Sequence, residues 1–572
     1  MQKLTYFLRP YKWAVLSMVV LMFIQTFGQL LQPHFTADII NYGVLEGDTT
    51  FIWRTGGIML LVVIFTAASS IGALYFSSKL GATLSRDFRK AIYNKATNLS
   101  LSEFNEIGSG SMITRNTNDI VQVSSIFVFG IQFLLPGPTM AIGALILALM
   151  RDRVLTLILL GVVVVALSVG YVVCFKALPH FMALQPKMDN INKTMREIIT
   201  GVRVIRAFNQ QGREHDRITS VAADYAQLSV KINKIFAVFM PAIFLAMNIG
   251  TIFILWFGGV RVIDGSTQIG NIMAVIEYSV HIMLAIMMMS WIVLSIPRAQ
   301  VSANRINEIL DMENTIADGT KPVPAVESLR FKNVGFAYQD ADESVLSDIS
   351  FEVSKGQTLA IMGTTGSGKS TLVNLIPRFY ENTKGSIEIN GIDIKDFPVK
   401  ELRKTIGFVT QKPIMFSGSV KDNIDFGNSA TDAKIAEAMD TAQATAFVEE
   451  KEGGLEEKVS QGGTNFSGGQ KQRLSIARAL ARNAKLYIFD DSFSALDYKT
   501  DRDLRISLRE KIKDSIFIIV AQRISTIKNA DQIIVLNDGQ IVAKGTHKEL
   551  LKTSQIYQDI VYSQLDEAEA LA

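Results

Sequence analysis

Six long apolar stretches fill the first half of this chain and limit the folds that are open to it. Each is long enough to cross a hydrocarbon core of ~30 Å as a helix that rises ~1.5 Å per residue. The composition agrees, since 48% of the residues are hydrophobic and the mean hydropathy is +0.25. We therefore predict an all-α membrane domain with spans at residues 14–36, 56–78, 121–150, 154–175, 235–260 and 269–296.

The distribution of Lys and Arg predicts how these spans are oriented. Six basic residues lie between the second and third spans and ten between the fourth and fifth, whereas the other three connections hold one, two and one. Cytoplasmic connections carry the basic excess, so we expect both termini and both long connections in the cytoplasm. The long connections are predicted to be helical, with short surface helices at "SMITRNTNDI" and "REIITGVRVIRAFNQQ".

The second half of the chain has the composition of a globular domain. Short β-rich runs such as "TLAIMG", "KLYIFDD" and "SIFIIVAQ" alternate with charged helical segments, which favours an α/β fold with a mostly parallel sheet. We predict a membrane domain at residues 1–312, a linker at 313–327 and a nucleotide-binding domain at 328–572. The small net charge of +3 gives no reason to expect nucleic acid as a partner, and the single cysteine, Cys174, supports neither a disulfide framework nor a zinc site.

The segment "GTTGSGKST" follows an apolar strand and opens a helix, which is the required context for a phosphate-binding loop. It predicts that ATP and Mg²⁺ are cofactors. Lys369 is expected to reach the β- and γ-phosphates, and Ser370 and Asp490 to hold Mg²⁺. The loop comprises Gly363, Thr364, Thr365, Gly366, Ser367, Gly368, Lys369, Ser370 and Thr371.

A second motif, "FSGGQKQRLSIARAL", resembles the signature of the ATP-binding cassette (ABC) family. With six spans fused upstream, nearly the whole chain resembles a half-transporter of the ABC exporter type, one membrane domain joined to one nucleotide-binding domain. The resemblance implies that two nucleotide-binding domains share each ATP site, so that one copy of this chain builds no complete site. The residues that it adds to the site are Tyr338, Gln411, Ser467, Gly468, Gly469, Gln470 and Asp497.

Each of these residues takes its role from the resemblance. Tyr338 matches the aromatic that stacks on adenine, although a core tyrosine is the alternative. Gln411 matches the glutamine that senses Mg²⁺, and the run from Ser467 to Gln470 matches the signature that faces the partner's nucleotide. Asp497 closes "SALD", which matches the loop that crosses to the opposite subunit.

Two positions depart from the family pattern, and both carry its chemistry. Asp491 stands where the family has the glutamate that polarises the attacking water, and Gln522 stands where it has a histidine. An amide donates a hydrogen bond to phosphate but carries no positive charge. The departures imply a degenerate site that binds ATP and hydrolyses little, as in bacterial heterodimeric ABC exporters of the multidrug type. The partner is then a second, homologous half-transporter that carries Glu and His.

Three alternatives stay open at this point. In the first, the two departures are neutral sequence drift without effect on hydrolysis. In the second, the chain forms a homodimer that exports lipid or peptide slowly. In the third, the chain is an ATP-gated channel or a regulatory subunit. The cargo is equally open. The run "HIMLAIMMMSWIVL" is rich in adaptable Met, and Glu277 is the only acidic residue in a span, which fits hydrophobic or cationic small molecules as well as packing against helices or membrane lipid.

Overall fold

A computed structural model describes residues 2–338, 341 and 343–564. The chain divides into two compact units. The first, the membrane unit, comprises Met1–Thr97 and Gly108–Met312, and the second, the nucleotide unit, comprises Asn98–Ile107 and Glu313–Ala572. The domain boundaries at residues 312 and 328 stay predictions, and the first strand of the nucleotide unit begins at Ser328.

The membrane unit contains six helical segments that are long and apolar enough to cross a membrane, which confirms the predicted number. The chain is therefore a multi-pass membrane protein. The first five segments extend beyond the predicted apolar cores, because more polar turns continue the same helices, whereas the sixth ends before the predicted limit at residue 296. The six segments are Lys3–Val44, Thr49–Asn98, Ser109–Arg151, Arg153–Thr200, Gln211–Ile263 and Ile269–Met289.

The helices behind these segments are unusually long. At ~1.5 Å per residue, the 50 residues of α2 span ~75 Å, more than twice the bilayer core. Asp152 starts α7, because its side chain accepts hydrogen bonds from the backbone amides of Val154 and Leu155. The main helices are α1 (Lys12–Asp38), α2 (Thr49–Asn98), α5 (Ile120–Leu134), α6 (Pro136–Arg151), α7 (Arg153–Thr200), α9 (Gln211–Ile263) and α10 (Ile269–Asp311).

The short helices differ in part from the prediction. The second predicted break is confirmed as α8 (Val202–Ala207) between α7 and α9. The first predicted break is wrong, since "SMITRNTNDI" forms α4 (Ser109–Thr114) and the π-helical turn η3 (Arg115–Asp119), which run on into α5. The separate short helix lies earlier, as α3 (Leu101–Ile107), because Gly108 adopts φ +78° and ends it. The remaining turns of the membrane unit are η1 (Gln2–Tyr11) and η2 (Ile39–Val44), whereas α3 belongs to the nucleotide unit.

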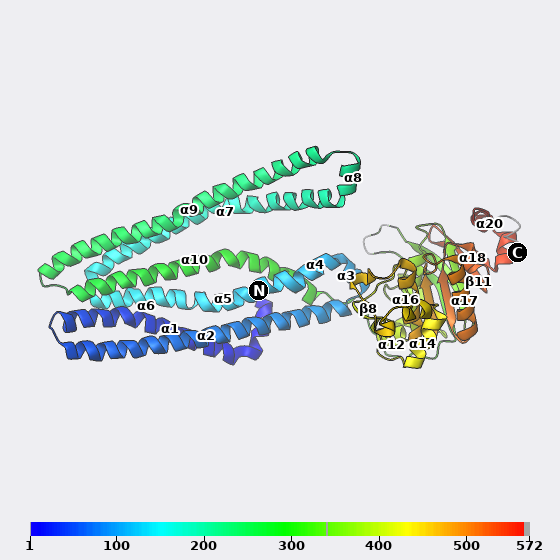
Figure 1. The fold of residues 1–572 in the computed structure, drawn as a ribbon, viewed down its shortest axis with the longest axis horizontal. Coiled ribbons are helices and arrows are strands. Elements are labelled where there is room, and N and C mark those ends of the chain that lie inside the picture. Colours follow the sequence, from blue (N-terminus) through cyan, green and yellow to red (C-terminus); the bar gives the residue numbers. More distant parts are fainter. Residues whose placement is uncertain (1, 339–340, 342, 565–572) are drawn as a thin grey trace. The chain divides into compact units, whose positions relative to one another are not determined.

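Within the membrane unit, α10 packs against α1, α5, α6 and α9, while α7 runs alongside α9 over much of its length (Figure 1). The helices approach closely where residues are small: a Cβ on Gly28 would lie 2.0 Å from the Thr66 hydroxyl oxygen. A polar contact joins η3 to α10. The fully buried Asp119 accepts hydrogen bonds from Ser302 at 2.9 Å and from Arg305 at 2.6 Å.

The nucleotide unit is built on two larger sheets and one short ribbon. The mostly parallel sheet that we predicted is present, in the order β12-β11-β3-β10-β9-β6, with only the β11–β12 pair antiparallel. Its strands are β3 (Thr358–Gly363), β6 (Ile406–Val409), β9 (Leu486–Asp490), β10 (Ile516–Val520), β11 (Gln532–Asn537) and β12 (Gln540–Gly545). A separate antiparallel sheet, β2-β1-β4-β5, was not predicted, and it comprises β1 (Ser328–Phe336), β2 (Leu346–Ser354), β4 (Lys384–Ile389) and β5 (Ile392–Asp393).

Helices cover the parallel sheet on both faces, which makes its strands apolar on both sides. Along β3, Leu359 and Ile361 enter one buried cluster, and Ala360 and Met362 enter the other. The ribbon is β7 (Gly418–Ser419) with β8 (Lys458–Val459). The helices are α11 (Lys369–Leu375), α12 (Val399–Lys404), α13 (Val420–Ile424), α14 (Asp432–Thr441), α15 (Thr445–Glu449), α16 (Gly468–Ala481), α17 (Tyr498–Lys511), α18 (Ile524–Ile527), α19 (His547–Thr553) and α20 (Gln555–Tyr562), with short turns at Ile394–Asp396, Gly454–Glu456 and Gln461–Gly463.

Candidate nucleotide-binding site

The predicted phosphate loop connects β3 to α11. Gly368 stands immediately before the helix with φ +93°, a conformation that a side chain strains, and a Cβ there would lie 2.8 Å from Leu346. The ammonium of Lys369 donates hydrogen bonds to the carbonyl oxygens of Gly363 at 2.9 Å and Thr364 at 2.6 Å. The ammonium of Lys369 is therefore held by the first two residues of its own loop.

Burial acts on the charged groups beside the loop. Desolvation lowers the pKa of Lys369, and the nearby carboxylates of Asp491 and Asp490 oppose that shift. Desolvation also raises the pKa of Asp490, opposed first by a hydrogen bond that the Ser370 hydroxyl donates at 3.0 Å. A divalent cation bound between these groups would lower the pKa of Asp490 again, because a positive charge favours the ionised carboxylate.

Four parallel strands bring the remaining polar groups to one edge of the sheet. The loop after β3, Gln411 after β6, the carboxylates at the end of β9 and Gln522 after β10 line one cavity of about 260 Å³. Carboxyl ends of parallel strands are where ligands bind in such sheets. The lining residues are Val345, Thr365, Gly366, Gly368, Lys369, Ser370, Thr371, Gln411, Asp490, Asp491, Val520 and Gln522.

Asp491 is held in an unusual position within this cavity. Its backbone adopts φ +47°, a left-handed conformation that few non-glycine residues take. One carboxylate oxygen, Oδ2, accepts hydrogen bonds from the side-chain amides of Gln411 at 3.2 Å and of Gln522 at 3.3 Å. The two family departures, Asp491 and Gln522, thus contact each other directly.

Tyr338 lies next to the loop and is 38% exposed, so the alternative of a core tyrosine does not describe it. Its hydroxyl lies 3.2 Å from the Thr371 hydroxyl. The ring meets Tyr380 edge-to-face, with centroids 5.4 Å apart, and Tyr380 accepts a hydrogen bond from Asn105 of α3 at 3.3 Å. Tyr380 and Val345 were missed by the sequence reasoning; the aromatic ending of "IPRFY" is a signal for Tyr380, whereas Val345 carries none.

The signature motif forms a well-defined helix start away from this cavity. Ser467 caps α16 through a reciprocal pair of hydrogen bonds with Gln470, and Gly468 opens the helix. Gly469 lies against the loop "SALD", since a Cβ there would be 3.3 Å from the Ala495 carbonyl oxygen. Asp497 caps α17 by accepting from the Thr500 amide at 2.9 Å. In the described chain, none of these residues lines the phosphate cavity.

A six-helix membrane unit joined to an ATPase unit of this design defines an ATP-driven membrane transporter. Residues 346–494 match the family described as ABC transporter, and residues 15–287 match the ABC transporter transmembrane region. The chain is 37% identical over 565 residues to an uncharacterized ABC transporter ATP-binding protein of Mycobacterium tuberculosis, covering 97% of each chain. The chain belongs to the ABC transporter family.

Two further similarities extend this result. An ATP-dependent lipid A-core flippase of Desulfotalea psychrophila is 31% identical over 573 residues, with 96% of each chain covered. A solved bacterial Atm1-family ABC exporter with ATP bound has the same fold, with a TM-score of 0.79, 23% identity and coverage of 98% of this chain and 99% of that one. The protein is thus an exporter-type half-transporter and an ATPase, with its nucleotide unit in the cytoplasm.

Proposed function

We propose that this chain is one subunit of a heterodimeric multidrug-type exporter, in which its own phosphate site binds ATP and hydrolyses it slowly. Its signature, Ser467 to Gln470, completes the partner's hydrolytic site. The observation that carries the proposal is the contact of Asp491 with both Gln411 and Gln522 through one carboxylate oxygen.

This contact bears on the hydrolytic step. A general base must come within hydrogen-bond reach of its water. Asp is one methylene shorter than Glu, which withdraws its oxygens by roughly 1.5 Å on the same backbone. One of the two carboxylate oxygens of Asp491 already accepts two amide protons, which lowers its ability to accept a proton from water. Gln522 donates a hydrogen bond but holds no charge and passes on no proton.

The residues around Ser370 fit a Mg²⁺ ion brought in with ATP. Hard divalent cations take oxygen ligands, and the Ser370 hydroxyl lies 3.0 Å from a carboxylate oxygen of Asp490, with Gln411 on the same cavity wall. Mg²⁺ in this place neutralises the charge of the β- and γ-phosphates. Lys369 binds the phosphates, and Tyr338 offers the adenine a half-exposed ring face.

The cargo that we propose is a hydrophobic or amphipathic compound. Along α10, Met273 is 44% exposed and Met288 is 38% exposed, whereas Met283 is buried. Glu277 is half-buried on the same helix and adds an attraction for cationic compounds. The lipid A-core flippase among the relatives supports a second candidate, slow export of lipid by a homodimer of this chain.

The first experiment is the subunit composition of the complex, purified from its native membrane through a tag on this chain. The proposal predicts a second band of similar size but different mass at a one-to-one ratio. A homodimer of the 63.2 kDa chain would refute the division of labour and leave Asp491 and Gln522 in both sites. Transport into reconstituted vesicles distinguishes an exporter from an ATP-gated channel. An exporter accumulates a dye against its concentration gradient, whereas a channel lets the dye pass only down that gradient.

A further inference from the structure

The residue after Gln522, Arg523, connects two loops of the nucleotide unit. Its guanidinium donates hydrogen bonds to two carbonyl oxygens of the loop "SALD", to that of Ser494 through Nη2 at 3.1 Å and to that of Leu496 through Nη1 at 3.4 Å. Among the described residues, no other group donates to either oxygen. Arg523 is therefore the donor that holds the backbone of this loop.

The loop "SALD" has few other contacts that fix its backbone. Phe493 and Leu496 are buried in the core of the nucleotide unit, whereas Ser494 and Ala495 between them are exposed. Exposed segments with few buried contacts open at little cost. The planar guanidinium of Arg523 donates in fixed directions, so it favours the one loop conformation in which both carbonyl oxygens point toward it.

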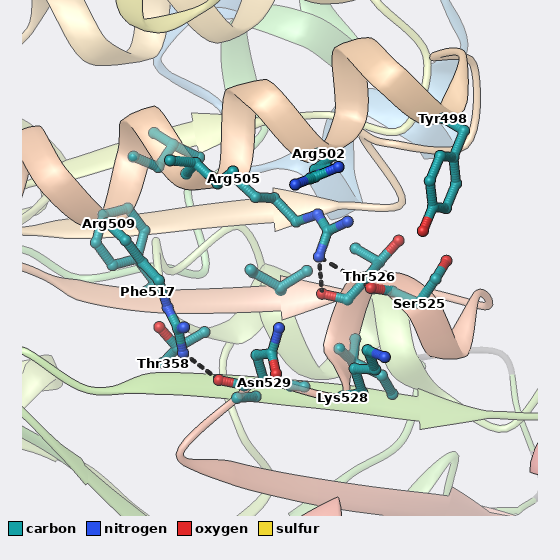
Figure 2. A pocket seen from close by; sticks show the side chains of 16 residues that line it. Thr358, Tyr498, Arg502, Arg505, Arg509, Phe517, Ser525, Thr526, Lys528 and Asn529 are labelled. Carbon is teal, nitrogen blue, oxygen red and sulfur yellow. Dashed lines mark hydrogen bonds between the residues drawn. The ribbon is translucent and has the colours of Figure 1, made fainter. Parts of the chain in front are cut away.

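The backbone that carries Arg523 is itself held from two sides. On one side, the side chain of Gln564 donates a hydrogen bond to the Gln522 carbonyl oxygen at 2.8 Å. On the other side, Arg505 lines a cavity of about 600 Å³ beside α17 and donates to the Ser525 carbonyl oxygen at 2.9 Å (Figure 2). The guanidinium of Arg523 therefore projects from a fixed base, and the loop that it binds is fixed in turn.

The loop "SALD" contacts both functional parts of the nucleotide unit. The Ser494 hydroxyl donates to the Asp491 carbonyl oxygen at 2.9 Å, and the Asp491 carboxylate accepts from Gln522 at 3.3 Å. At the signature, a Cβ on Gly469 would lie 3.3 Å from the Ala495 carbonyl oxygen. A displacement of this loop therefore moves the backbone against which the start of the signature helix packs.

We propose that Arg523 is a positioning residue for ATP hydrolysis at the partner's site. It holds the loop "SALD", and with it the start of the signature helix, in the conformation that the partner's nucleotide requires. This role rests on the proposed function, because these two elements serve a partner's site only in a dimer. Within the described chain, Arg523 does not line the phosphate cavity, so ATP binding by this chain does not depend on it.

The test is Arg523→Gln in the purified full-length complex in lipid nanodiscs, with turnover and binding measured separately. We expect kcat to fall about tenfold, because a displacement of about 1 Å in a catalytic assembly costs up to roughly 10²-fold. The KM for ATP and the amount of γ-labelled ATP that the complex retains should stay within about twofold. Arg523→Lys should lower kcat only about threefold, because its ammonium still reaches one of the two carbonyl oxygens.

Further variants separate positioning from folding. The matched control, Arg502→Gln, removes an exposed cation of α17 that makes no hydrogen bond within the described chain, and kcat should be unchanged. Asp497→Ala disturbs the same loop at its last residue, which caps α17. Arg523→Gln with Asp497→Ala should then be no slower than the slower single variant, because both act through one loop. If Arg523→Gln lowers the Tm, Arg523→Lys carries the comparison.

Three results would overturn this role for Arg523. The first is an unchanged kcat in Arg523→Gln, and the second is a rise in KM or a loss of retained ATP that accounts for the slower turnover. The third is a double variant in which the two effects multiply. A homodimer in the purified complex would instead refute the proposed division of labour. Arg523→Gln would then still have to lower kcat at unchanged KM, because each copy would serve the other's site.

Discussion

Restoring the family residues at positions 491 and 522 is the sharpest test of the degenerate site. Asp491→Glu lengthens the carboxylate by roughly 1.5 Å. The Gln411 and Gln522 amides, at 3.2 Å and 3.3 Å, still bind it. Each such hydrogen bond stabilises the unprotonated carboxylate by about 1 kcal/mol. The two together therefore lower the rate of hydrolysis about 30-fold. A base effect of roughly 10²-fold is then reduced to about threefold, so we expect Asp491→Glu alone to raise hydrolysis at this site by about that factor.

The double change has a different outcome. Asp491→Glu with Gln522→His removes one of the two amide bonds and supplies an imidazole to the γ-phosphate. A well-placed general base contributes roughly 10²–10⁴-fold, so we expect about 100-fold faster hydrolysis of the nucleotide held by this chain. The excess of the double change over the product of the two single changes measures the coupling between the residues.

The assay follows ATP labelled in its γ-phosphate and retained by the purified complex after a chase with unlabelled ATP. The wild-type complex should keep one labelled ATP through many turnovers, and the double variant should release it as phosphate. Asp538→Glu is the matched control, because Asp538 also has a left-handed backbone, at φ +44°, and lies in the β11–β12 turn. Full activity from Asp491→Glu alone, or no retained ATP in the wild type, would refute the reasoning.

Three other predictions follow from the same geometry. Tyr338→Ala should weaken ATP binding about 10-fold through the loss of one stacked ring, and Tyr338→Trp should preserve it, as measured by equilibrium binding. Burial raises the pKa of Asp490 above 3.8, so the folded state holds that proton more tightly and its stability falls as pH rises above that value; Asp490→Asn should flatten this part of the profile of Tm against pH in the nucleotide-free protein. In the membrane unit, Asp119→Ala leaves Arg305 and Ser302 without their acceptor and should cost about 1–3 kcal/mol, seen as a lower Tm, whereas the exposed Asp216→Ala should change little.

Much of the architecture could be predicted because its signals are local. Apolar runs of bilayer length indicate spans whatever lies around them, and "GTTGSGKST" between a strand and a helix specifies a phosphate loop within nine residues. The break at α3 was misplaced because the polar run after it is helical, and polarity alone does not end a helix. The antiparallel sheet was missed because β2 and β4 are mixed in polarity, with buried and exposed residues alternating along β2, and so lack the apolar runs of the parallel strands.

The sequence alone determined the six spans, the parallel sheet and the identity of the groups at its edge, since these depend on neighbours along the chain. Only the tertiary structure decided which groups meet. Asp491 contacts Gln411 from 80 residues away and Gln522 from 31, and Asp119 contacts Arg305 across 186. The cavity of about 600 Å³ beside α17 is likewise assembled from α17, β3, β10 and the turn after α18 (Figure 2). Such contacts follow from strand order and helix packing, which no local pattern specifies.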